Sequence, residues 1–387
     1  MNVLLLLASW VFYAALDWRS LPVLVGLSAA VWYLGRRDSK PARAAGIGLC
    51  LGVLLLARCL GLSPLGLSFF ALQAISYLTD VERGLVAPRR FEDVALYLGF
   101  FPTVASGPIV KARDFFPQLD GKRRGDFSYG IQRFCLGLFK KAVIADRLGL
   151  CVDAVFAAPE VYSGGSIALA VVSYAIQIYC DFSGYSDMAI GMGRWLGFDL
   201  GENFRVPYGA KSLRDFWRRW HISLSAWLRE YVYFPLGGSR RGRVRLHLLA
   251  VMVLSGAWHG FEGRFLFWGA AHGLLLVWER FRDRGLGRMG TVLAVWLLWV
   301  PFRAESLQAA WVILLRMATF APGVRYYPAY TLVYGGLVLL SQLLWREGFQ
   351  KPLNLRRFSG KVVFCTFLLM ILLLACAGET AFLYAGF

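Results

Sequence analysis

Apolar stretches of ten or more residues recur along almost the whole chain, separated by short polar connections. Of the 387 residues, 58% are hydrophobic and 17% are charged. A typical soluble domain has about 45–50% apolar and about 25% charged residues, so this composition excludes an ordinary soluble domain. It predicts an all-α, polytopic membrane protein, because a helix satisfies its own backbone hydrogen bonds in lipid.

The apolar stretches give the expected positions of the helices. A full membrane span needs about 20 apolar residues, so the shorter stretches predict tilted, broken or half-inserted helices inside a protein-lined interior. No connection is long enough to separate folding units, and we expect residues 1–387 to form a single integral-membrane domain. The predicted helices cover residues 3–15, 21–34, 45–62, 94–103, 131–144, 167–179, 246–258, 265–278, 291–300, 310–320, 330–344 and 362–387.

The chain is strongly basic, with a net charge of +18. Its basic residues concentrate in the connections at 36–43, 111–124, 214–219 and 240–245, which is the pattern of cytoplasmic loops in membrane proteins. Nucleic-acid binding is disfavoured, since no basic soluble domain or recognition motif is present. These loops are suited instead to membrane lipids with acidic headgroups, or to a negatively charged cytosolic donor.

One of only four histidines, His259, ends an apolar stretch between Trp258 and Gly260. An ionisable group at membrane depth is costly and is therefore a functional candidate. The apolar setting favours the neutral imidazole, which can act as a general base. The alternative is a structural histidine that donates a hydrogen bond to a backbone carbonyl of a neighbouring helix.

His221 precedes a stretch in which Trp220, Leu224 and Trp227 recur at helical spacing. That spacing predicts an amphipathic helix lying in the membrane interface, with its arginines toward the headgroups. His221 is then either a tether for this helix or a second site residue that orients the acceptor or His259. His272 is expected on the next helix, facing back toward His259, with a structural role as the alternative; we assign no role to His247.

Several kinds of site lack their sequence signals. No two histidines stand three or four residues apart, which argues against a metal site. The chain has no G-x-S-x-G motif, and Cys180 beside Asp181 has no basic neighbour in sequence to hold it as a thiolate. The seven cysteines are interpreted as small core hydrophobes. With a metal site and a serine or cysteine nucleophile both disfavoured, the chemistry that remains is the direct transfer of a group, assisted by a general base.

Two acidic residues, Asp181 and Asp187, fall in one segment beside the predicted helix at 167–179. Charges at membrane depth need partners. We therefore expect both to pair with the arginine cluster at 214–219, where the ion pairs would fix helix packing.

Four motifs stand out in the middle of the chain: CDFSGYSDMAIG at 180–191, FWRRWHISLSAWLREYVYFPLGG at 216–238, WHG at 258–260 and WGAAHG at 268–273. Together they resemble the membrane-bound O-acyltransferase (MBOAT) superfamily, and most closely its bacterial branch of alginate O-acetylation membrane proteins. Supporting matches occur at residues 64–77, 105–110, 137–141 and 300–305, so the resemblance spans most of the chain around a core region at 179–280.

The resemblance implies a ring of about 10–12 tilted transmembrane or re-entrant helices around a central tunnel. It maps the superfamily's signature histidine onto His259 and its second histidine onto His221. The implied reaction moves an acyl group, usually acetyl, from a cytosolic thioester to a hydroxyl of a cell-surface polysaccharide or a periplasmic protein. The thioester, acetyl-CoA or an acyl carrier, is a substrate rather than a bound cofactor. A periplasmic SGNH-hydrolase-like acetyltransferase is the implied partner, and the bacterial inner membrane the implied location.

The motifs also point to further site residues. Departures from the pattern at Glu230, Ala257 and Ala271 leave the histidines in place but alter side chains around the implied tunnel, so the acceptor stays open. His272 and Asn203 are expected in support. The residues expected to contact the substrates are Trp258, Trp220, Ser223, Asp181, Tyr185, Asp187 and Arg229.

Three alternatives remain open at this point. A D-alanyl transferase of teichoic-acid type would take its acyl group from a carrier protein. A transporter or flippase without acyl chemistry would show paired broken helices in two related halves, and we find no such halves. A structural subunit would leave the setting of His259 without purpose.

Overall fold

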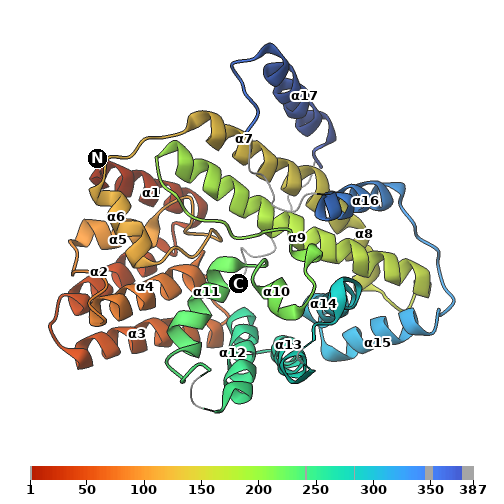
Figure 1. Cartoon of the computed structure of the whole chain (residues 1–387), viewed down its shortest axis with the longest axis horizontal. Coiled ribbons are helices and arrows are strands. Elements are labelled where there is room, and N and C mark those ends of the chain that lie inside the picture. The colour runs from red at the N-terminus through yellow and green to blue at the C-terminus, as the bar shows by residue number, and fades with distance from the viewer. Residues whose placement is uncertain (1, 240–241, 283, 345–351, 377–387) are drawn as a thin grey trace. The chain divides into compact units, whose positions relative to one another are not determined.

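The computed structural model describes residues 2–239, 242–282, 284–344 and 352–376. These residues contain helices and no β-strand, with one isolated bridge between Tyr162 and Val324, so the all-α prediction is confirmed. The α-helices are α1 (Asn2–Asp17), α2 (Leu21–Gly35), α3 (Lys40–Cys59), α4 (Leu67–Glu82), α5 (Phe91–Gly99), α6 (Ala112–Asp120), α7 (Phe127–Leu138), α8 (Asp146–Ala157), α9 (Gly164–Trp195), α10 (Leu213–Trp217), α11 (Ile222–Leu228), α12 (Val244–His259), α13 (Gly263–Arg282), α14 (Gly287–Arg303), α15 (Leu307–Ala318), α16 (Ala329–Leu344) and α17 (Phe358–Leu374) (Figure 1).

The described chain divides into two compact units. The first comprises residues 2–134 and 185–202, and the second residues 135–184 and 203–376. In the first unit, α1 and α2 pack against α5, and α3 packs against α4. Nearly every residue of α4 is buried, so this apolar helix forms the centre of the first unit.

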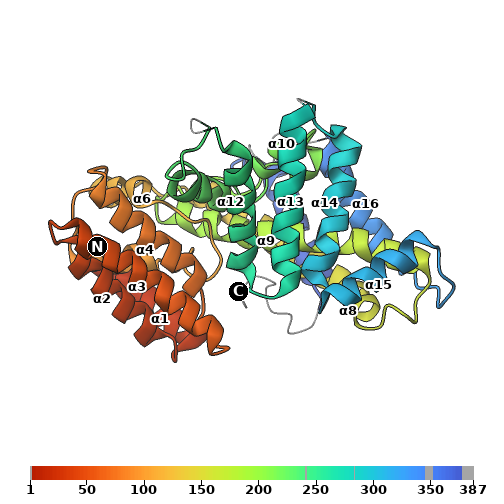
Figure 2. The same ribbon diagram turned by 90° about the horizontal axis from the view of Figure 1, so that it is seen from below.

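The second unit carries most of the motif residues. Its helices α12, α13 and α14 lie side by side (Figure 2). Two short π-helices interrupt the regular pattern, at Phe139–Ala145 after α7 and at Arg229–Tyr233 after α11. Single π-helical turns are frequent at functional sites, and both of these lie beside motif residues.

Helix α9 differs most from its prediction. The apolar stretch predicted a helix at 167–179, but α9 runs for 32 residues through the polar CDFSGYSD motif. Its polar side chains do not break it, because their charges are paired within the protein. Within the part of the chain that the structure describes, two helices, α3 and α9, are long and apolar enough to cross a membrane.

Other boundaries follow local rules. Helix α5 ends at Gly99, before Pro102, rather than continuing to residue 103. The helix predicted at 362–387 is α17, and residues 377–387 lie outside the described residues, as do positions 240 and 241 of one basic connection. Helices α4, α6 and α8 were not among the predicted stretches. Of these, α6 is a short amphipathic helix that contains Pro117.

Candidate active site

His259 is the last residue of α12 and is 3% exposed. Its imidazole lies among aromatic rings, with centroid distances of 4.8 Å to Trp258, 4.9 Å to Phe302 and 5.4 Å to Trp268. The Trp268 and Phe302 rings stand at 89° and 79° to the imidazole plane. The apolar wall that the sequence predicted is therefore present, and it is built from three helices.

Two glycines allow this arrangement. A β-carbon added at Gly256 would lie 2.3 Å from the carbonyl oxygen of Phe265, and one added at Gly269 would lie 2.3 Å from that of Met252. Any larger residue would force α12 and α13 apart. Close helix contact through small residues thus brings Trp268 of α13 against His259 of α12.

His221 lies in the connection between α10 and α11 with a left-handed backbone, φ 43° and ψ 55°. The interfacial helix predicted through Trp220, Leu224 and Trp227 is therefore wrong: the helix begins only at Ile222, and all three side chains are buried within the protein. A non-glycine residue in this conformation persists only where its surroundings hold it.

Two backbone hydrogen bonds stabilise this conformation of His221. The amide of Ile222 donates to the carbonyl of Asn203 over 2.9 Å, and the amide of Arg205 donates to the carbonyl of Arg219 over 2.9 Å. These two bonds flank His221 and tie its connection to the segment at 203–206.

The His221 side chain is 1% exposed. Its Nδ1 lies 3.2 Å from Oδ1 of Asn203, and its ring is 4.7 Å from Phe182 and 6.0 Å from Trp258. This connection is outside the two candidate membrane spans, and burial lowers the pKa of His221 to about 3. The ring is therefore neutral at physiological pH, and its unprotonated nitrogen can accept a hydrogen bond.

Trp258 links the two histidines, since its indole contacts both His221 and His259. A second aromatic path joins the same region: Trp268 stacks on Trp299 at 5.7 Å, and Trp299 contacts Trp220 at 5.0 Å. The structure thus brings His259, His221, Trp258 and Trp220 into one aromatic cluster of the second unit.

His272 lies on α13, the helix after His259, as expected. Its ring contacts Trp268 at 5.0 Å and Trp217 at 5.1 Å. Because Trp268 also contacts His259, His272 packs against one of the rings that surround His259. His247 binds the carbonyl of Gly238 through Nδ1 at 3.1 Å, so it stabilises the turn ahead of α12.

The predicted partners of the two aspartates are wrong. Asp181 pairs with Lys141, whose Nζ lies 2.8 Å from its Oδ1 and 2.8 Å from Oδ1 of Asp146. Of the arginine cluster, Arg214 and Arg218 are exposed and Arg219 pairs with Asp215 in its own helical turn. Asp181 is therefore paired with Lys141 of the π-helix at Phe139–Ala145 and not with the arginine cluster.

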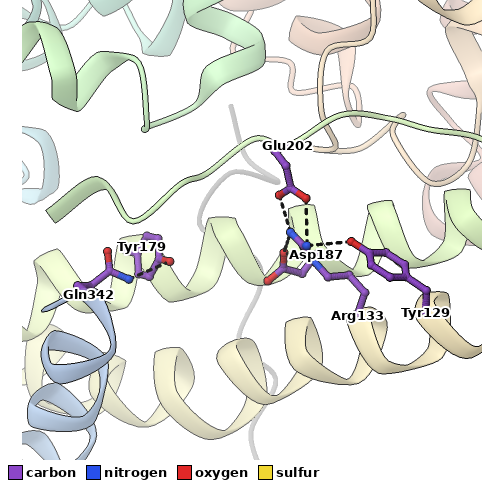
Figure 3. Close-up of polar contacts among 6 residues, drawn as sticks. All are labelled: Tyr129, Arg133, Tyr179, Asp187, Glu202 and Gln342. Carbon is purple, nitrogen blue, oxygen red and sulfur yellow. Dashed lines mark hydrogen bonds and ion pairs between the residues drawn. The ribbon is translucent and has the colours of Figure 1, made fainter. Parts of the chain in front are cut away.

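In the first unit, Asp187 pairs with Arg133 of α7 at 2.6 Å. The same guanidinium donates to both carboxylate oxygens of Glu202, at 3.1 and 2.7 Å, and to the hydroxyl oxygen of Tyr129, at 3.2 Å (Figure 3). Arg133 is buried, so this bidentate cluster fixes α7 to α9 within the first unit.

The remaining predicted residues lie in different settings. Ser223 is the second residue of α11, and both its hydroxyl and its amide donate to Oδ1 of Asn203, at 2.9 and 3.2 Å. Tyr185 is half-buried on α9, whereas Arg229 is exposed at the start of the second π-helix. In the second unit, Gln342 of α16 donates to the hydroxyl of Tyr179 at 3.1 Å (Figure 3). Substrate contact by these residues stays a prediction.

Glu279 holds the start of α10 in place, although no motif in the sequence pointed to it. This buried carboxylate of α13 accepts the amides of Leu213 at 2.8 Å and Arg214 at 3.3 Å, the first residues of α10. Arg133 and Lys141 were overlooked as well. The available signal was the same for all three, an ionisable residue within or at the end of an apolar helix.

Residues 67–310 match a protein-family model described as MBOAT, membrane-bound O-acyltransferase family. The chain belongs to this family. A "Probable alginate O-acetylase AlgI" of Pseudomonas fluorescens is 38% identical over 344 residues, which covers 80% of this chain and 68% of that protein. A "Peptidoglycan O-acetyltransferase" of Helicobacter pylori is 33% identical, with coverages of 81% and 73%. A "Teichoic acid D-alanyltransferase" of Bacillus subtilis is 26% identical, with coverages of 58% and 60%.

This MBOAT member is therefore an O-acyltransferase. The recognition made from the four motifs is confirmed, including the similarity to alginate O-acetylation proteins. A transporter without acyl chemistry and a structural subunit are set aside. The family is membrane-bound, in agreement with the composition of the chain.

Proposed function

We propose that this MBOAT enzyme moves an acetyl group across the bacterial inner membrane. The donor is a cytosolic thioester, acetyl-CoA, and the acceptor is a hydroxyl of a cell-surface polysaccharide or of a periplasmic SGNH-hydrolase-like partner. The observation that carries the proposal is the pair of buried histidines, His259 and His221, that both contact Trp258. The names of the relatives, an alginate O-acetylase and a peptidoglycan O-acetyltransferase, support acetyl as the group transferred.

In this proposal His259 is the general base. It takes the proton of the acceptor hydroxyl as the oxygen attacks the thioester carbonyl carbon. The C–S bond then breaks, the new ester forms, and the imidazolium returns its proton to the leaving thiolate, which departs as a thiol. General-base catalysis contributes roughly 10²–10⁴-fold in rate.

The aromatic rings around His259 suit this cycle. Aromatic faces attract cations, and Phe302 and Trp268 lie 4.9 and 5.4 Å from the imidazole. They stabilise the imidazolium while it holds the proton, and they exclude the water that would hydrolyse the thioester. His221 is proposed to orient the acceptor hydroxyl, with Trp258 and Trp220 as the walls between which the substrates meet.

The wider architecture belongs to the same proposal. We infer a multi-pass, single-domain ring of tilted helices with a tunnel along which donor and acceptor approach from opposite sides. The basic connections attract the acidic donor and the lipid headgroups. His272 and Asn203 support the two site histidines.

Transfer in sealed proteoliposomes tests the proposal. Radiolabelled acetyl-CoA is added outside, and alginate oligomers or peptidoglycan fragments are enclosed. We expect alkali-labile acetyl ester on the enclosed acceptor. Ester formed only when donor and acceptor share one side would contradict transmembrane transfer. Ester formed from a D-alanyl carrier thioester but not from acetyl-CoA would instead establish the D-alanyl alternative, for which the relative of Bacillus subtilis is the model.

A further inference from the structure

The Asn203 side chain faces two groups at once. Its Oδ1 lies 3.2 Å from the backbone nitrogen of Ser223 and 3.2 Å from Nδ1 of His221. A backbone N–H is only a donor, so the Asn203 atom that meets Ser223 is the carbonyl oxygen. Because an amide oxygen is only an acceptor, Nδ1 of His221 must carry the proton.

We infer that Asn203 is a positioning residue that fixes His221 as the Nδ1–H tautomer and leaves Nε2 as the basic nitrogen for the substrate. The inference rests on the proposed role of His221. Among the described residues, the buried Nε2 has no hydrogen-bond partner. A second donor, the hydroxyl of Ser223, binds the same Oδ1 at 2.9 Å and keeps the amide from rotating.

The backbone fixes the same geometry. His221 has φ 43°, and Val206, on the segment paired with it, has φ 48°. A left-handed conformation is uncommon for histidine and a genuine outlier for a β-branched residue. Strain of this kind persists where the structure over-determines it, which occurs most often at functional sites.

Histidine-selective ¹⁵N NMR in lipid nanodiscs tests the tautomer without any need for activity. The chain has four histidines, and His221→Ala identifies the signals of this one. We expect protonated Nδ1 and unprotonated Nε2 in the wild-type protein, with the Nδ1–H population falling in Asn203→Leu. A wild-type Nε2–H tautomer, or a Nδ1–H population unchanged in Asn203→Leu, would overturn the inference. Ser225→Ala is the control, because that hydroxyl binds the carbonyl of Trp220 and not the imidazole.

Turnover gives a second readout. Asn203→Leu should lower kcat about tenfold, the loss expected for one hydrogen bond, and should add little in a His221→Ala background. Equal losses in both backgrounds would refute action through His221. Wild-type turnover of His221→Ala together with the expected tautomer would refute only the proposed catalytic role.

The isosteric variant Asn203→Asp covers the case in which leucine disturbs folding. A carboxylate beside Nδ1 favours the imidazolium, so Nε2 of His221 should gain its proton at a higher pH in the ¹⁵N spectra of Asn203→Asp than in those of the wild-type protein. The elements that contact His221 also carry Asp181, held by Lys141, and His259. An unmoved titration of Nε2 in correctly folded Asn203→Asp would contradict the inference.

Discussion

Replacing Gly269 by alanine tests whether close contact of α12 and α13 builds the site. The added methyl would lie 2.3 Å from the carbonyl oxygen of Met252 and 3.2 Å from Cα of Gly256. Ordinary contact begins at 3.4 Å, so the backbones must separate by 3.4 minus 2.3, or 1.1 Å, at this point. Overpacking of this size costs about 1–3 kcal/mol.

The same shift moves Trp268 away from His259. A misplacement of about 1 Å near reacting groups can cost about 100-fold in rate. We therefore expect Gly269→Ala to melt at a lower temperature than the wild-type protein. Its rate of acetyl transfer should fall by at least about tenfold, even if the two helices relax partly around the added methyl group. Melting is followed by tryptophan fluorescence in detergent, and transfer is followed in proteoliposomes.

Gly336→Ala is the matched control. Gly336 also lies within a helix of the second unit, α16, but no heavy atom lies within 4 Å of its added β-carbon. Alanine there meets no contact and improves helix propensity, so stability and turnover should stay at or above the wild-type values. A Gly269→Ala protein that matched wild type in both measurements would refute the packing argument.

Two further predictions concern buried charges. Glu279→Ala removes the acceptor of the Leu213 and Arg214 amides and should destabilise α10 by about 1–3 kcal/mol; trypsin cleavage of the 211–219 region should quicken, and unchanged protection would contradict the capping role. Arg133→Gln removes the cation between Asp187 and Glu202 and should lower stability by about 3–5 kcal/mol; a melting temperature equal to wild type would show that the cluster does not stabilise the first unit.

The sequence predicted what depends on local pattern. Apolar runs gave the approximate positions of α1, α2, α3, α12 and α13, because helices buried in lipid or protein must be apolar over their length. The end of α12 at His259 and the contact with Trp258 followed from the neighbouring tryptophan and the flanking glycine, whereas the rings of Trp268 and Phe302 come from other helices and were not predicted.

What depends on tertiary contact was not predictable in this way. The partners of Asp181 and Asp187 lie 40 and 54 residues away along the chain, and no spacing rule links residues so far apart. The left-handed backbone of His221 also depends on tertiary contact, because the backbone hydrogen bonds that stabilise it involve Asn203 and Arg205, which lie 16 or more positions earlier in the chain. Helical periodicity at Trp220, Leu224 and Trp227 predicted an interfacial helix, because periodicity shows neither the break before Ile222 nor the protein elements that bury these side chains.

The most direct test of the account is the turnover of His259→Ala beside that of His247→Ala. Both histidines lie on α12 and are buried, but only His259 is proposed to take the acceptor proton. The melting temperature and the gel-filtration elution profile first establish that both variants are folded. We then predict that His259→Ala loses at least about 100-fold in acetyl transfer, whereas His247→Ala retains most of it. Wild-type turnover in folded His259→Ala would contradict the central claim.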